Sequence, residues 1–255
     1  MNEDERRQAK AFSSLTYEGF RELASRTDLS RYQRIGFPDS LRAGREEAIF
    51  ADIRAKMPIL DEPGRTILDI GPGCSDLPHL LIAHCAAKGH RLVLVDSEEM
   101  LAALPDADFT RKVRGPFPDC ADALSDLADG VDAIICYSVL HYVFPDASIF
   151  AFLDAATALL RPGGGALLLG DLPNASMRRR FLASAAGAAF HREYTGRDED
   201  PVPGFNTPAE GEMDDAVLAA LVSRARASGA DAWLLPQPPS LPMANRREDL
   251  LVRKP

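Results

Sequence analysis

Thr66-Ile-Leu-Asp-Ile-Gly-Pro-Gly-Cys-Ser-Asp76 is the stretch that decides the fold of this chain. Its first residues form a short apolar run, which predicts a buried parallel strand because both faces of such a strand need apolar cover. Gly71 and Gly73 then allow a tight turn and a close approach of the backbone to a ligand. A helix is expected to open at Ser75, whose hydroxyl suits an N-cap. A strand, a glycine turn and a helix in this order form the first half of a nucleotide-binding α/β unit.

The charges around this turn distinguish two classes of nucleotide. A dinucleotide places its pyrophosphate on the helix N-terminus, and its fingerprint wants glycine where this chain has Asp76. Asp69 and Asp76 would then flank an anion. S-adenosylmethionine (SAM) has no phosphate and carries an ammonium and a sulfonium, so carboxylates near the turn favour its binding. The sign of the charge therefore favours SAM over NAD.

Two motifs resemble those of class I SAM-dependent methyltransferases. Asp69-Ile-Gly-Pro-Gly-Cys-Ser75 resembles the first motif, D/E-x-G-x-G-x-G, with Ser75 at the third glycine position. Arg161-Pro-Gly-Gly-Gly165, followed by an apolar run, resembles the turn before the fifth strand of that family. The resemblance spans residues 64 to 253. It implies an α/β fold with a seven-stranded, mostly parallel Rossmann-like sheet whose last strand is antiparallel, together with N-terminal helices.

Apolar runs bounded by turn residues predict the strands of such a sheet. They are expected at residues 67–70, 91–96, 109–114, 131–137, 166–171, 231–235 and 248–253. The last two fit a closing antiparallel hairpin, whereas a doubled dinucleotide fold would add another strand–helix–strand unit. Apolar positions at helical spacing predict helices, with a turn over 32–38 between the first two. Besides the helix that opens at Ser75, they are expected at residues 9–25, 42–57, 97–104, 146–160, 174–189 and 215–228.

The chain divides into two parts. Residues 1–60 precede the first strand and are expected to form a helical segment, either a lid over the active site or only a cover for one face of the sheet. Residues 61–255 are expected to form the SAM-binding methyltransferase domain. Within it, residues 191–213 show almost no core periodicity. A stretch of this length is usually functional or disordered, and here it is expected to be a substrate-side insertion.

The resemblance implies a set of residues that bind SAM and its product S-adenosylhomocysteine. Asp96 ends the second expected strand and is placed to accept hydrogen bonds from both ribose hydroxyls. For the adenine, the acid that the family often uses is replaced by Pro116, which leaves Phe117 as a packing surface and Asp119 as an acceptor. The expected cofactor-binding residues are Asp69, Gly71, Pro72, Gly73, Ser75, Asp96, Ser97, Phe117, Tyr137 and Ser138.

Methyl transfer from SAM requires few catalytic side chains. The sulfonium is already activated, so the protein mainly positions the nucleophile and excludes water. His141 is the candidate general base, because its pKa range suits proton abstraction near neutrality; the alternative is that it only shapes the pocket wall. Tyr142 and Asp171 are expected on the substrate side. Tyr137-Ser-Val-Leu140 replaces the N/D-P-P-Y/F form of amino-directed enzymes, which argues against methylation of nucleic-acid bases.

Charge and apolar runs indicate which classes of partner and which cellular compartment to expect. The formal net charge is −9, and no basic stripe is present, so nucleic acid is a disfavoured partner. No apolar run approaches the roughly 20 residues that span a bilayer, and Met1 to Arg7 lacks the apolar core of a signal peptide. We therefore expect a cytoplasmic protein without a membrane partner. The histidines lie apart from cysteines and acid clusters, so no catalytic metal is expected.

The sequence thus predicts a SAM-dependent methyltransferase that acts on a small molecule, with oxygen favoured over nitrogen as the acceptor. A second hypothesis is a non-catalytic SAM-binding subunit or scaffold. An NAD-dependent oxidoreductase is a third, which Asp76 and the closing hairpin disfavour. The sequence indicates neither the acceptor nor the oligomeric state.

Overall fold

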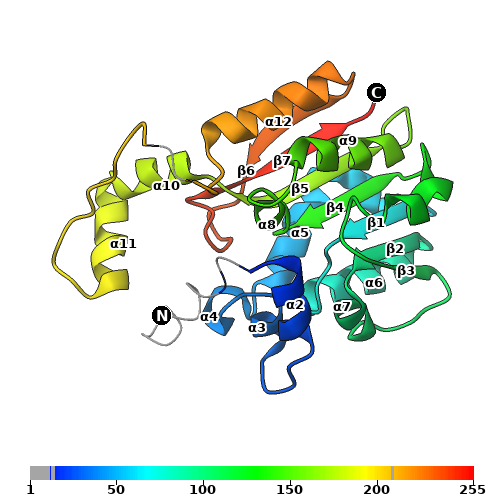
Figure 1. Cartoon of the computed structure of the whole chain (residues 1–255), viewed down its shortest axis with the longest axis horizontal. Coiled ribbons are helices and arrows are strands. Elements are labelled where there is room, and N and C mark those ends of the chain that lie inside the picture. The colour runs from blue at the N-terminus through cyan, green and yellow to red at the C-terminus, as the bar shows by residue number, and fades with distance from the viewer. Residues whose placement is uncertain (1–11, 13–14, 208–209) are drawn as a thin grey trace.

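Seven strands form one sheet in the order β3-β2-β1-β4-β5-β7-β6, with helices on both faces (Figure 1). This computed structural model describes residue 12 and residues 15–207 and 210–255. The strands are β1 (Thr66–Ile70), β2 (Arg91–Asp96), β3 (Thr110–Arg114), β4 (Ala133–Tyr137), β5 (Ala166–Pro173), β6 (Asp231–Pro236) and β7 (Arg247–Arg253). Met1 to Arg7, which lacks the apolar core of a signal peptide, lies outside the described residues. The start of the helix predicted from Ala9 lies outside them too.

The pairing of the strands confirms the predicted fold class. β1 pairs in parallel with β2 and β4, β2 with β3, and β4 with β5. β7 runs antiparallel to both of its neighbours, β5 and β6. The chain order reverses between β1 and β4. In open α/β sheets such a reversal leaves a crevice at the carboxyl ends of the strands, where ligands bind.

Helices of very different length connect and flank these strands. They are α2 (Tyr17–Ala24), α3 (Arg31–Arg34), α4 (Asp39–Arg42), α5 (Glu46–Lys56), α6 (Asp76–Lys88), α7 (Glu98–Ala102), α8 (Leu140–Val143), α9 (Ile149–Leu159), α10 (Ala175–Leu182), α11 (Ala185–Thr195) and α12 (Asp215–Ala227), with 3₁₀ turns η1 (Pro58–Asp61) and η2 (Ala121–Leu127). None of the described helices is long and apolar enough to cross a membrane.

The alternation of side chains along the strands creates two apolar cores. Leu68 of β1 faces the core that α9 and α12 complete, whereas Ile67 faces the core that α5 and α6 complete. All five residues of β4 are buried, as expected for a strand covered on both faces. The two cores fix the sheet between its helical layers and leave the carboxyl ends of the strands free to form a site.

Several helices begin or end at other residues than predicted, because a glycine or a helix cap fixes the boundary. The helix expected over 42–57 begins only at Glu46, as α5, because Gly44 at a φ of +72° separates it from Arg42, the last residue of α4. The turn expected over 32–38 begins as α3, because Ser30 makes a complete capping box with Gln33. These corrections concern short helices whose formation depends on caps rather than on apolar periodicity.

The segment after β5 also differs from the prediction. The helix expected over 174–189 breaks at Ser184, which accepts a hydrogen bond from the Gly187 N–H and so starts α11. α11 then continues to Thr195, so the first residues of the expected 191–213 insertion are helical. Residues 208–209 of that insertion are outside the described part. α10 and α11 form an arm that projects from the sheet (Figure 1).

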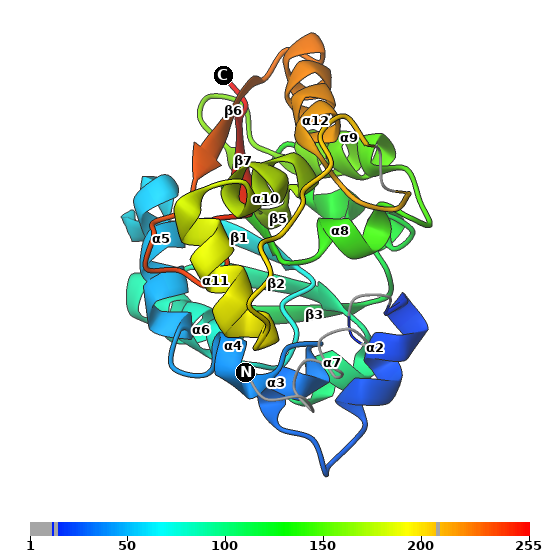
Figure 2. The same ribbon diagram turned by 90° about the vertical axis from the view of Figure 1, so that its left-hand side faces the viewer.

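The short N-terminal helices gather on one side of the molecule. α2 packs against α7, α3 against α2 and α4 against α3, and these helices lie in the same region of the molecule (Figures 1 and 2). They therefore face the region where β1 and β2 end.

Candidate active site

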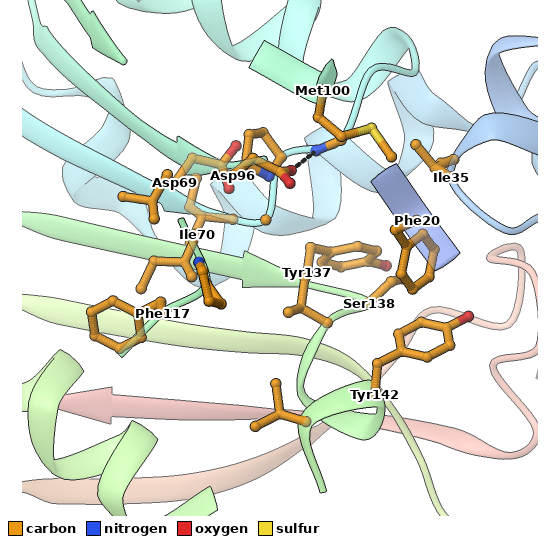
Figure 3. A pocket seen from close by; sticks show the side chains of 18 of the residues that line it. Phe20, Ile35, Asp69, Ile70, Asp96, Met100, Phe117, Tyr137, Ser138 and Tyr142 are labelled. Atoms are coloured by element: carbon orange, nitrogen blue, oxygen red, sulfur yellow. Dashed lines mark hydrogen bonds between the residues drawn. The ribbon is translucent and has the colours of Figure 1, made fainter. Parts of the chain in front are cut away.

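A cavity of about 280 Å³ lies at the carboxyl ends of β1, β2 and β4, and N-terminal helices close its other side. Figure 3 shows Asp69 and Asp96 towards one end and Phe20, Tyr137 and Tyr142 towards the other. The structure brings nearly all of the predicted cofactor residues into this lining: Asp69, Gly71, Pro72, Gly73, Ser75, Asp96, Phe117, Tyr137 and Ser138.

The glycine turn forms the floor of the cavity and has no space for side chains. Gly71 has a φ of +72° and Gly73 a φ of +67°, which is the left-handed region that glycine adopts readily. A Cβ on Gly71 would lie 2.5 Å from a methyl group of Val139, and a Cβ on Gly73 would lie 2.7 Å from one of Ile35. Both predicted glycines are therefore required by conformation and by space.

Asp96 fixes this turn to the end of β2. Its carboxylate accepts hydrogen bonds from the Gly73 N–H at 2.9 Å and from the Ser97 N–H at 2.7 Å. Burial raises the pKa of Asp96 to about 6, although these two N–H groups act in the opposite direction. Gly71 donates its N–H to the Val95 carbonyl at 2.8 Å. The N–H groups of both glycines are therefore already donated within the protein.

Asp69 is a second buried carboxyl in the lining. It is 6% exposed and precedes Ile70, the last residue of β1. Burial, followed by the charge of Asp96, raises the pKa of Asp69 to about 8. A cation bound next to these two groups would favour their ionised forms.

Aromatic and apolar side chains cover the next part of the lining. Phe117 is buried and packs edge-on against Phe152 of α9, with ring centroids 4.9 Å apart. Asp119 is also in the lining, although it is exposed at its rim. The structure therefore places both predicted adenine candidates at the cavity, and their contact with adenine stays a prediction.

The far end of the cavity is formed by the last residue of β4, by residues that follow β4 and by α2. Tyr142 packs edge-on against Phe20 of α2, with ring centroids 4.7 Å apart. The Tyr137 hydroxyl lies 3.4 Å from the Gln237 amide nitrogen. The Ser138 hydroxyl donates to Asp171. This end therefore combines aromatic walls with several hydroxyl groups.

Three predicted residues lie outside the lining. The Ser97 hydroxyl accepts a hydrogen bond from the Met100 N–H and caps α7. Asp171, 2% exposed, is held behind the cavity wall, where its carboxylate accepts hydrogen bonds from Ser138 and, at 3.0 Å, from Arg247. Asp171 therefore reaches the cavity only through these partners, and its substrate-side role stays a prediction.

His141 is the third residue outside the lining. It lies next to Tyr142 on α8, with ring centroids 4.1 Å apart. Burial and the charges of Arg247 and Arg42 hold the pKa of His141 well below its usual range, so the imidazole is neutral at pH 7. Its buried Nδ1 has no hydrogen-bond partner among the described residues. The role of His141 as a base stays a prediction.

The side-chain contacts of Asp76 and Ser75 differ from those that the sequence predicted. The Asp76 carboxylate accepts a hydrogen bond from the Tyr32 hydroxyl at 2.6 Å and pairs with Arg31. Its charge is thus compensated by α3, and the electrostatic argument for a cationic ligand depends on Asp69 instead. Ser75 stands at the N-cap position of α6, but its side chain makes no capping hydrogen bond.

Sequence reasoning missed the residues that the N-terminal segment contributes to the lining. Tyr17 and Phe20 come from α2, Ile35 follows α3, and Arg42 ends α4. No local motif marks them, since they reach the cavity only through the packing of short helices against the sheet.

The described residues hold no group of three or more His, Cys, Asp or Glu side chains placed to bind a metal ion. Among the carboxylates of the lining, Asp96 accepts its hydrogen bonds from backbone N–H groups. The groups of the lining that remain for a ligand are therefore hydrogen-bonding side chains and buried carboxyls, which suit an organic ligand.

Comparisons with known proteins agree with this geometry. Residues 68–168 match a family model described as a methyltransferase domain. This region runs from β1 to β5 and includes the glycine turn and Asp96. A search of curated protein sequences gives no match.

Solved structures share the fold at low sequence identity. The CurJ carbon methyltransferase is 13% identical, with 98% of this chain and 68% of that chain covered and a TM-score of 0.56. A chain from the complex between the Haloferax volcanii Trm112 methyltransferase activator and a provisionally assigned methyltransferase is 15% identical, with coverages of 92% and 97% and a TM-score of 0.52. A provisionally assigned S-adenosylmethionine-dependent methyltransferase from Listeria monocytogenes is 14% identical, with coverages of 84% and 100% and a TM-score of 0.53. At these identities the likeness concerns the fold alone.

Proposed function

We propose that this chain, whose residues 68–168 match a methyltransferase domain, is a class I SAM-dependent methyltransferase that methylates a small organic molecule and prefers oxygen to nitrogen as the acceptor atom. The observation that supports a small acceptor best is that the cavity is covered on two sides. Tyr17, Phe20 and Ile35 of the N-terminal segment line it opposite the sheet. Enclosed, mostly apolar cavities with a few polar groups are typical of small-molecule sites.

The chain's own groups fit SAM better than a dinucleotide. Gly71 and Gly73 have already donated their N–H groups, which removes donors that a pyrophosphate would need. We propose that Asp96 binds the ribose hydroxyls, that Asp69 lies near the cationic part of the cofactor and that Phe117 packs against the adenine. SAM supplies an activated methyl group, and the protein has to position the acceptor and exclude water.

The preference for oxygen is supported by the charges at the far end of the cavity. Arg42 is 3% exposed and is in the lining. A buried guanidinium repels the protonated form in which most aliphatic amines exist at neutral pH. A hydroxyl or carboxyl acceptor avoids this repulsion.

A hydroxyl acceptor has to lose its proton during or after the transfer. We retain His141 as the candidate base, because a neutral imidazole can accept a proton and its Nδ1 is unpartnered in the described part of the chain. Tyr142, its neighbour on α8, is in the lining and is the substrate-side residue that we propose.

We further propose that residues 1–60 serve as a lid, that residues 61–255 form the methyltransferase domain and that residues 191–213 belong to the substrate side. The lid proposal is supported by polar contacts between α2 and α7. The Arg21 guanidinium donates three hydrogen bonds of 2.8–3.1 Å to the Glu99 carboxylate. Such contacts can break and re-form as α2 moves, whereas α5 of the same segment belongs to an apolar core and stays in place.

The experiment is methyl transfer from SAM that carries a labelled methyl group. The purified protein is incubated with separate pools of phenols, carboxylic acids, amines, proteins and nucleic acids. We expect label in a phenol or carboxylic acid pool. Label confined to the protein or nucleic-acid pool would refute a small-molecule acceptor, and label confined to the amine pool would refute the preference for oxygen.

A further inference from the structure

We propose that Arg42 is a carboxylate-binding residue of the cavity. This inference rests on the proposed function, since it concerns a ligand of the same site. It extends that function by assigning the chemical group that the buried guanidinium receives.

The first observation is that the guanidinium of Arg42 is buried but not satisfied. Its side chain is 4% exposed and belongs to the cavity lining. Its Nε donates one hydrogen bond, to the Glu46 carboxylate at 3.2 Å. Its terminal nitrogens make no hydrogen bond with any described residue. These nitrogens are not among the fully enclosed atoms that lack a partner, so a ligand in the cavity can accept their hydrogen bonds.

The second observation is that the guanidinium is held in a fixed orientation. It lies over the Phe37 ring at 4.6 Å and over the Tyr137 ring at 5.5 Å. A planar guanidinium that contacts two aromatic rings loses little additional freedom when it binds. Its fork of N–H groups matches the two oxygens of a carboxylate.

The third observation is that the neighbouring acids do not fully occupy this cation. Asp171 is 3.7 Å from Nη1 of Arg42, which is beyond hydrogen-bond distance, and it already accepts hydrogen bonds from Ser138 and Arg247. Burial raises the pKa of Glu46, which favours its neutral form. The positive charge of Arg42 is thus only partly balanced inside the protein.

Two molecules could bring a carboxylate to Arg42 in this cavity. One is SAM, through the α-carboxylate of its methionyl part. The other is the acceptor, if it is an organic acid. Arg42 adjoins both regions, because Glu46 lies against Ser75 beside the glycine turn, whereas Tyr137 and Asp171 border the far end. The chemistry of recognition is the same for both, so the experiment has to separate the sources.

The test uses Arg42→Gln, with Arg45→Gln as the matched control because Arg45 is exposed in the same segment. Calorimetry measures the affinity for S-adenosylhomocysteine and for 5′-methylthioadenosine, which has the same nucleoside without the amino-acid carboxylate. Ligand-observed NMR measures the binding of benzoate to the protein saturated with S-adenosylhomocysteine. Arg42→Lys, which keeps the charge but loses the fork, is measured alongside, and thermal melting verifies that each variant is folded.

If the cofactor brings the carboxylate, Arg42→Gln weakens S-adenosylhomocysteine about tenfold or more and leaves 5′-methylthioadenosine within about twofold. If the acceptor brings it, both nucleosides bind as in the unaltered protein and benzoate binding is lost in Arg42→Gln. Arg42→Lys gives an intermediate loss in either case, and Arg45→Gln gives none.

The proposal is overturned if folded Arg42→Gln keeps its affinity for S-adenosylhomocysteine and also still binds benzoate. It is overturned as well if that affinity is kept and the unaltered protein itself binds no benzoate. It is equally overturned if both nucleosides weaken by the same factor. Should Arg42→Gln not fold, Arg42→Lys alone decides, and unchanged affinities there contradict the proposal. Failure of the proposed function is distinguishable. A protein that does not use SAM would bind neither nucleoside in its unaltered form, and a wrong acceptor class is identified by the labelled-methyl experiment.

Discussion

At the residue scale, the glycine turn offers the sharpest test of how close packing builds the site. We predict that Gly71→Ala destabilises the protein by about 2–5 kcal/mol, because it adds the strain of a positive φ and overpacking against Val139. Chemical denaturation measures the loss. The variant should also bind S-adenosylhomocysteine more weakly, since the floor of the cavity moves.

Gly64→Ala is the matched control for this prediction. Gly64 has a φ of +69° but a Cβ there would meet no described atom within 4 Å. It therefore measures the strain of the left-handed backbone alone, about 1–2 kcal/mol. Equal losses in the two variants would show that contact with Val139 contributes nothing.

The buried carboxyl of Asp69 predicts how stability depends on pH. Its pKa in the folded protein is about 8, against an ordinary value of 3.8. Between these values the folded state binds one more proton than the unfolded state, so stability falls as the pH rises from about 4 to about 8. Asp96, whose pKa is raised to about 6, acts in the same direction over a narrower range.

We predict that Asp69→Asn, which cannot ionise, makes the ligand-free protein less sensitive to pH. The slope of unfolding free energy against pH between 5 and 8 should become shallower by roughly 1 kcal/mol per pH unit. Urea denaturation at several pH values measures it, with Asp122→Asn as an exposed control. An unchanged slope would mean that Asp69 ionises in the folded protein as readily as in the unfolded chain.

Single residues were predictable where a local pattern fixes their place. Gly71, Gly73 and Asp96 follow apolar strands directly, so the strand ends place them together at one edge of the sheet. Tyr17 and Arg42 were not predictable, because folding of the N-terminal segment brings them to the cavity from more than twenty residues before the first strand.

At the element scale, polar contacts attach the N-terminal helices to the domain. α3 is held by Arg31 and Tyr32, which share the Asp76 carboxylate at the start of α6. Ile35, just after α3, covers Gly73. Movement of α3 would therefore uncover the glycine turn, which connects these contacts to the entry and release of the cofactor.

We predict that the double variant Arg31→Ala, Tyr32→Phe releases S-adenosylhomocysteine about threefold to tenfold faster, because two hydrogen bonds that hold α3 are lost at about 0.5–1.5 kcal/mol for a typical bond. Stopped-flow displacement measures the rate. Arg26→Ala is the control, since Arg26 pairs with Asp28 inside the same segment. Release rates that match the unaltered protein would contradict a lid formed by α3.

Elements were predictable in proportion to the apolar surface that they bury. The strand over 131–137 was evident because every residue of β4 is buried. The break at Ser184 was not, because α10 and α11 carry few buried residues and a cap decides where each begins. Ser75 shows the same limit, since its type and position suggested a cap that its side chain does not make.

At the scale of the whole molecule, the order of the strands determines where the chemistry occurs. β1 and β4 are neighbours although two strands intervene in the sequence. The loops that leave them diverge and open the cavity between the glycine turn and α8. The antiparallel β7 closes the sheet beside β5 and supplies Arg247, which holds Asp171 behind the cavity wall.

The central claim is that this cavity binds SAM through the glycine turn and Asp96. Calorimetric titration with S-adenosylhomocysteine tests it most directly, on the unaltered protein and on Asp96→Ala, with NAD as the competing nucleotide and Asp122→Ala as the control. We predict micromolar or tighter binding to the unaltered protein, no binding of NAD, and at least a tenfold loss in Asp96→Ala as hydrogen bonds to a charged group disappear. Absence of S-adenosylhomocysteine binding, or an affinity that Asp96→Ala leaves unchanged, would contradict the claim.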